Sequence, residues 1–143
     1  MDAGYSEEDV QALLARLSSA EPKRRANALR GLAEAPLADR RVLAAAEALL
    51  HDETLTLLSI PYVFGEVRWH AAAAVAALRG ALQMSEVVRI PDVPVALTTD
   101  KIGALARAAG LAPGRGGIEG VLETLARLRQ LGLVPRRTLV RRP

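Results

Sequence analysis

Apolar residues recur every three or four positions along most of the chain, which is the spacing of one face of an α-helix. Ser6 followed by acidic residues to Asp9, and Pro22, are typical of helix starts. The pattern predicts four helices in the first half of the chain, at about 6–18, 22–35, 38–51 and 66–82. Residues 53–65 are interpreted as a longer, more apolar connection between the third and fourth helices.

The pattern changes near residue 85. Residues 86–97 contain β-branched residues and two prolines, which indicate an extended segment or an edge strand. Two further helices are predicted at about 99–110 and 117–131, ended by Gly110 and Gly132 respectively. The tail, residues 133–143, is basic and could form one short strand.

Composition favours helices throughout. Half of the 143 residues are apolar, mostly Ala, Leu and Val, and there are only one Trp, one Phe and two Tyr. An all-β domain usually contains more aromatic and β-branched residues. We therefore predict a mainly all-α fold: a short stack of antiparallel helical hairpins over residues 1–85, and a helix-turn-helix-like part over 86–143 flanked by short extended segments. Each part is small for independent folding, so we expect the two to pack as one compact unit.

Two segments of the first part align with each other, Glu21–Ala33 and Gly65–Leu78. In each, an arginine (Arg25 or Arg68) is followed by apolar residues three, four and seven positions later. The offset of 43 residues lies within the period of HEAT-type repeats. The chain here resembles HEAT-like (armadillo-type) repeat proteins over roughly residues 7–82. The resemblance implies stacked helical hairpins that present a surface for recognition, and it supplies no catalytic residues.

The fourth predicted helix is apolar nearly all round. Opposite its main core stripe lies a second stripe formed by Trp69, Ala73, Ala76 and Gly80, which indicates burial on two sides. Two interpretations stay open: Trp69 is covered by another part of the chain, or it is an exposed anchor for a partner. The candidate partner-binding residues are Tyr62, Phe64, Arg68, Trp69, Ala73 and Ala76.

Charge is unevenly distributed along the chain. Residues 1–100 contain 10 basic and 14 acidic residues, a net charge of −4, whereas residues 101–143 contain 9 and 2, a net charge of +7. The order of elements over 86–142 weakly resembles a winged helix, which implies phosphate contacts by a basic tail. Glu119 and Glu123 oppose that interpretation, because they lie where a recognition helix would meet DNA. The candidate contacts to nucleic acid or to an acidic partner are Arg127, Arg136, Arg137, Arg141 and Arg142.

Chemistry-bearing patterns are scarce. The chain has no cysteine, and neither His51 nor His70 has a second histidine at helical spacing or an obvious cluster of carboxylates around it. No phosphate-binding or hydrolase motif occurs. The longest apolar run, Ala71–Leu78, is too short to span a bilayer, and the acidic start does not resemble a signal peptide. We therefore expect a cytoplasmic protein without metal, cofactor, small-molecule substrate or membrane partner.

The first functional hypothesis is a non-enzymatic protein–protein interaction module, an adaptor or accessory subunit that uses a helical-repeat surface. The alternative is a nucleic-acid-binding regulator that acts through the Arg-rich C-terminal part. An enzyme whose polar residues come together only in the fold is a third hypothesis.

Overall fold

The computed structural model describes residues 5–85, 88–112 and 114–141. The first half contains three helices, a 3-10 turn, a two-stranded hairpin and a fourth helix: α1 (Glu7–Leu17), α2 (Pro22–Glu34), α3 (Arg40–Ala48), η1 (Leu49–His51), β1 (Leu55–Ser59), β2 (Val63–Glu66) and α4 (Arg68–Ala81). The second half contains strands on either side of two helices: β3 (Val88–Pro94), β4 (Leu97–Thr98), α5 (Thr99–Ala108), α6 (Gly117–Gln130) and β5 (Arg136–Arg141).

The helices expected from the apolar spacing are all present. Ser6 begins α1 as expected, because its hydroxyl accepts a hydrogen bond from the Asp9 backbone while the Asp9 carboxylate accepts one from the Ser6 backbone. Pro22 is the first residue of α2, where its missing N–H has no partner to lose. The extended segment expected at 86–97 is confirmed over Val88–Pro94 as β3, and the strand expected in the tail over Arg136–Arg141 as β5. Residues 86, 87, 142 and 143 of these two predictions lie outside the described residues.

The prediction of a mainly all-α fold is wrong, because the chain is mixed α/β with two small antiparallel sheets. One sheet has the order β1-β2-β4, and the other pairs β3 with β5. The residues interpreted as an irregular connection, 53–65, contain the β1–β2 hairpin. Thr56, Leu57 and Leu58 are buried in succession, so β1 lacks the polar–apolar alternation that identifies a half-buried strand.

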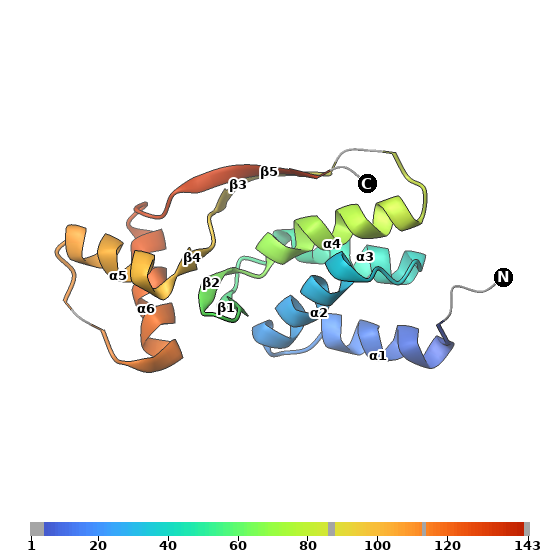
Figure 1. Cartoon of the computed structure of the whole chain (residues 1–143), viewed down its shortest axis with the longest axis horizontal. Coiled ribbons are helices and arrows are strands. Elements are labelled where there is room, and N and C mark those ends of the chain that lie inside the picture. The colour runs from blue at the N-terminus through green and yellow to red at the C-terminus, as the bar shows by residue number, and fades with distance from the viewer. Residues whose placement is uncertain (1–4, 86–87, 113, 142–143) are drawn as a thin grey trace.

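The first hydrophobic core is built around α4. Ala71, Ala74, Val75 and Leu78 of this helix are fully buried and pack with apolar residues of α1, α2 and α3. Small alanine side chains let helices approach closely. Val93 of β3 belongs to the same core, so α4 is covered by helices on one side and by the β3–β5 ribbon on another. Figure 1 shows this ribbon running from the C-terminal helices along α4.

The second core joins parts of the chain that the sequence assigned to different units. Leu57 and Phe64 of the hairpin pack with Leu97, and with buried residues of α5 and α6 that include Ile102 and Leu125. The hairpin lies between the N-terminal and the C-terminal helices (Figure 1). The expected boundary near residue 85 is therefore not a boundary between hydrophobic cores.

Within the described residues, no helix is both long and apolar enough to cross a membrane.

Candidate interaction surface

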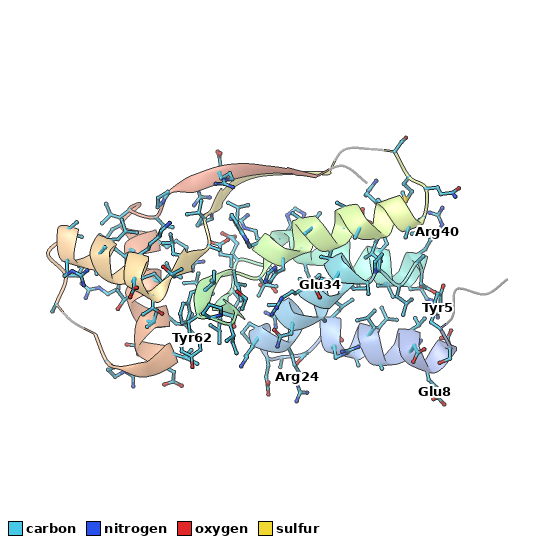
Figure 2. The ribbon with its side chains drawn as sticks, viewed as in Figure 1. Tyr5, Glu8, Arg24, Glu34, Arg40 and Tyr62 are labelled. Atoms are coloured by element: carbon cyan, nitrogen blue, oxygen red, sulfur yellow. The ribbon has the colours of Figure 1, made fainter. Side chains whose placement is uncertain are left out.

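The β1–β2 hairpin ends in Ile60, Pro61 and Tyr62, which we call the hairpin tip. The side chains of Ile60 and Tyr62 are 73% and 48% exposed, although both are large and apolar. The Tyr62 ring meets the buried Phe64 ring edge-on, with centroids 6.1 Å apart and planes at 76°. Phe64 therefore supports Tyr62 from below while Tyr62 keeps half of its surface in solvent. Figure 2 shows Tyr62 between the N-terminal and the C-terminal helices.

A hollow lies on each side of the hairpin tip, and Ile60 borders both. The first, which we call the α2–β1 groove, has a volume of about 450 Å³ and is lined by Lys23, Asn27, Arg30, Gly31, Glu34, Leu57, Leu58, Ser59 and Ile60. The second has a volume of about 460 Å³ and is lined by Ile60, Pro61, Tyr62, Thr98, Thr99 and Asp100. These volumes are in the range of small-ligand and peptide side-chain sites.

The α2 wall of the groove carries two cations that have no ion-pair partner in the part of the chain that the structure describes, Lys23 and Arg30. Their neighbours Arg24 and Arg25 do have partners: Arg24 lies 3.8 Å from Glu21, and Arg25 lies 2.8 Å from Asp52. Both groove cations are exposed. They are therefore available to an anionic group that enters the groove.

His70 of α4 holds β1 in place behind the groove. Its Nε2 lies 3.1 Å from the carbonyl oxygen of Leu58. Burial lowers the pKa of His70, and the positive charge of Arg30 lowers it further, against the opposing effect of the Leu58 hydrogen bond. The imidazole is therefore neutral at pH 7 and donates its Nε2 proton to that carbonyl.

Arg25 of α2 binds the segment that directly precedes β1, residues 52–54. Its guanidinium donates to the Asp52 carboxylate at 2.8 Å, to the Ser19 carbonyl at 2.8 Å and to the Thr54 hydroxyl at 3.3 Å. Burial alone would raise the pKa of Asp52, but hydrogen bonds from Thr54 and Arg25 bring it below its ordinary value. Asp52 is therefore ionised, and the pair fixes the distance between α2 and the hairpin.

The base of the hairpin contains a buried carboxylate, Glu66, which is 1% exposed. Arg68 donates to its Oε1 at 2.6 Å, and Arg129 of α6 donates to its Oε2 at 3.0 Å. Arg129 also donates to the Glu53 carbonyl at 2.6 Å. Two guanidinium groups thus neutralise one buried charge, and the cluster connects the hairpin, α4 and α6.

The structure distributes the predicted partner-binding residues over three environments. Tyr62 is exposed at the hairpin tip, whereas Phe64 is fully buried beneath it and Ala76 is buried on α4. The Arg68 guanidinium forms an ion pair with the Glu66 carboxylate at 2.6 Å. Trp69 is partly buried and packs against the first core, and Ala73 is partly buried beside it on α4. These residues do not form one continuous surface.

The predicted basic contacts are also dispersed. Arg127 of α6 and Arg136 and Arg137 of β5 are exposed. Arg142 and the side chain of Arg141 lie outside the described residues.

The sequence interpretation missed Ile60, Lys23 and Arg30 as surface candidates. The signal for Ile60 was present, because Ile-Pro-Tyr separates two apolar runs at the spacing of a hairpin turn. Lys23 and Arg30 carry no comparable signal, since their lack of partners depends on where the carboxylates lie in the fold. Neither hollow could be inferred from the periodicity of single helices.

Across the described residues, no group of three or more histidine or acidic side chains is placed to hold a metal ion. No protein-family model, characterised protein or solved structure compared with the chain matches it. The HEAT-like and winged-helix-like resemblances therefore remain predictions.

Proposed function

We propose that the chain is a non-enzymatic interaction module that binds a protein partner through the hairpin tip. The observation that carries this proposal is the exposure of Ile60 and Tyr62 between two hollows. A single exposed apolar side chain is common on protein surfaces, but adjacent ones beside concave sites are typical of partner contacts. Tyrosine is also among the residues that contribute most to binding energy at interfaces.

The construction of the hairpin supports the same proposal. Phe64 beneath the tip and the Glu66 cluster at the base hold the hairpin rigidly against α4 and α6. A preordered surface loses less conformational entropy on binding than a flexible loop does. The hairpin tip therefore needs little rearrangement when a partner binds.

The cation distribution favours a protein partner over nucleic acid. Near the start of α6, Arg115 pairs with Glu119 and Glu123, and the Arg129 guanidinium is occupied by Glu66. A recognition helix would present unpaired arginines in its first turns, whereas the exposed Arg127 lies in the last turn of α6.

Site-specific photo-crosslinking in the native cell tests the proposal. A photoreactive amino acid is placed at Ile60, at Tyr62, or at Ala12, which is exposed on α1 away from the hairpin. We expect the same discrete protein adduct from positions 60 and 62 and its absence from position 12. Equal adducts from all three positions, or adducts only from position 12, would overturn the proposal.

Substitution at the tip then measures its contribution to affinity. Binding of the purified adduct partner to Tyr62→Ala should be weaker by about 2 kcal/mol if Tyr62 is a central contact. The matched control is Tyr5→Ala, because the Tyr5 hydroxyl donates to the Ala38 carbonyl on the helical part of the molecule, away from the tip. Unchanged partner affinity in that variant would separate a local contact from a general loss of stability.

A further inference from the structure

We infer that the α2–β1 groove binds an amphipathic helix of a partner protein, which lies along α2 and carries acidic residues on the side that faces it. This inference rests on the proposed function, because Ile60 of the hairpin tip borders the groove and the same partner covers both. It adds the secondary structure and the charge of that partner, which the exposed tip does not specify.

The wall of the groove that α2 forms is one exposed face of this helix. Its residues are spaced at i, i+4, i+7, i+8 and i+11, and all of them are exposed: Lys23, Asn27, Arg30, Gly31 and Glu34. This is the spacing with which a helix contacts a second helix that lies along it. The hairpin tip forms the opposite rim, where Ile60 is 73% exposed. The groove can therefore receive a helix between α2 and the hairpin.

Gly31 favours close approach of that helix. A glycine inside a helix is less favourable than an alanine, because it loses more backbone freedom on folding. The backbone of Gly31 is helical, and a Cβ there would have nothing within 4 Å in the described part of the chain, so internal packing does not require a glycine. The distance between two packed helices depends on the side chains at their contact, and a glycine permits the shortest distance. Gly31 therefore fits the point at which the bound helix comes closest to α2.

The groove has few backbone groups to offer, which favours a helix over an extended segment. The backbone groups of α2 are paired within the helix, and the Leu58 carbonyl accepts from His70. Leu57 and Leu58 are only 3% and 1% exposed, so β1 does not present an open edge here. An extended ligand would turn unpaired N–H and C=O groups toward this surface, whereas a helix pairs these groups internally.

The charges on the α2 face specify the charge pattern of the ligand. Lys23 and Arg30, which have no ion-pair partner among the described residues, are seven positions apart, a rise of about 10 Å, and Glu34 lies about 6 Å further along. A helix that runs alongside α2 has the same rise, so its side chains at equal spacing meet these three groups. Complementarity requires an acid, a second acid seven positions away and a base four positions beyond it, in either chain direction. Figure 2 labels Glu34 on this helix and Arg24 close to its other end.

Synthetic helices test the inference independently of the native partner. Two fluorescent, alanine-rich peptides of about 20 residues carry the pattern of two glutamates and a lysine, one in each chain direction, with leucines beside the glutamates to face Ile60. In the first pair of controls glutamate and lysine are exchanged. In the second pair, proline at two central positions prevents the helix while the charges remain. We expect one probe to bind at least about tenfold more tightly than both of its controls.

A substitution at Gly31 locates the binding without weakening the fold. Gly31→Gln should weaken binding of that probe at least about tenfold, because the new side chain occupies the point of closest approach. Glutamine is a better helix former than glycine, so the midpoint of thermal unfolding should not fall. The matched control Ala104→Gln, at an exposed position of α5, should leave binding unchanged. A purely structural role of Gly31 would change the stability and not the affinity.

Charge exchange tests the cations of the α2 face. Lys23→Glu/Arg30→Glu should weaken binding of the probe at least about tenfold, and should bind the charge-exchanged peptide more tightly than the parent chain does. Arg40→Glu, an exposed charge reversal on α3, should change neither affinity. Circular dichroism confirms that each variant is folded.

Equal binding of the probes and the charge-exchanged peptides, equal binding of the proline peptides, or unchanged affinity of Gly31→Gln would overturn the inference. If these results appear while crosslinking at Ile60 still yields a partner, the groove proposal fails and the interaction module stands. If a probe binds as expected but positions 60 and 62 give no adduct, the tip proposal fails instead.

Discussion

Arg129 of α6 donates a hydrogen bond of 3.0 Å to the buried carboxylate of Glu66, 63 residues earlier in the chain. Glu66 lies at the end of β2, so this bond connects the C-terminal helices to the hairpin that carries Ile60 and Tyr62. The two halves of the chain are therefore joined by a charged contact as well as by the second hydrophobic core.

The Glu66 cluster should contribute strongly to stability. In Glu66→Ala, Arg68 and Arg129 lose their common partner while their side chains remain only 13% and 33% exposed. We expect the free energy of unfolding to fall by about 3 kcal/mol, because the partly buried Arg68 is then left with only the largely exposed carboxylate of Glu53, at 3.9 Å. Urea unfolding followed by circular dichroism measures the change.

The matched control is Glu119→Ala, which removes a carboxylate that also faces an arginine but is 83% exposed. Exposed pairs contribute little, so this variant should stay within about 0.5 kcal/mol of the parent chain. Similar losses in both variants would contradict the assignment of Glu66 as the charged link between the halves.

Close packing of the hairpin should make Gly65 intolerant of a side chain. A Cβ at this position would lie 2.9 Å from Leu58 Cδ1 and 3.4 Å from the Ala96 backbone, and Leu58 is itself fully buried. Gly65→Ala should therefore lower the free energy of unfolding by about 1–2 kcal/mol through overpacking.

The substitution Gly31→Ala should raise the stability of the chain, whereas Gly65→Ala should lower it. Gly31 lies inside α2 with open space around a Cβ, and alanine is the stronger helix former. We expect this variant to gain about 0.5–1 kcal/mol of stability. Thermal unfolding of both variants under identical conditions should shift their midpoints in opposite directions, and a stabilising Gly65→Ala would show that Leu58 can move aside.

The contrast between α4 and β1 shows how far sequence alone could lead. The helical spacing identified α4 and its burial on two sides, because the positions of apolar residues show which faces of a helix are buried. The strand β1 gave no such pattern, since its central residues are buried on both faces and its partner strand β2 has only 4 residues. Short buried strands are identified by their pairing, which a single sequence does not display.

The candidate surface was predicted only in part for a similar reason. Tyr62 was selected from its residue type and its place in an apolar connection, and it is exposed. Phe64 was selected on the same grounds, yet it is buried beneath Tyr62, because β2 leads from the exposed turn into the second hydrophobic core. Lys23 and Arg30 became candidates only once the fold showed which carboxylates pair with the neighbouring arginines.

Stability should depend on the protonation of His70. Burial lowers its pKa below the ordinary value of 6.5, so the unfolded chain takes up this proton at a higher pH than the folded chain does. The contribution of neutral His70 is therefore fully present above pH 6.5 and is lost as the pH falls through the lowered pKa of the folded state.

The variant His70→Gln has no ionisable side chain at position 70, but its amide N–H can still donate to the Leu58 carbonyl. At pH 7.5 the variant should be less stable than the parent chain by about 1 kcal/mol or less, the net value of an ordinary hydrogen bond. Between pH 6.5 and pH 5.5 this deficit should shrink, as measured by urea unfolding at each pH. A deficit that is constant across this interval would contradict the buried, neutral imidazole.

The final prediction concerns the nucleic-acid alternative. Because Arg115 is paired with Glu119 and Glu123 beside α6, we expect the chain not to retard a short DNA or RNA duplex in a gel-shift experiment at low ionic strength. Retardation that weakens steeply with salt, is lost in Arg136→Ala/Arg137→Ala and persists in Arg16→Ala/Arg40→Ala would contradict this expectation. Phosphate contacts by β5 would then account for the positive charge of residues 101–143, and the regulator hypothesis would replace the interaction module.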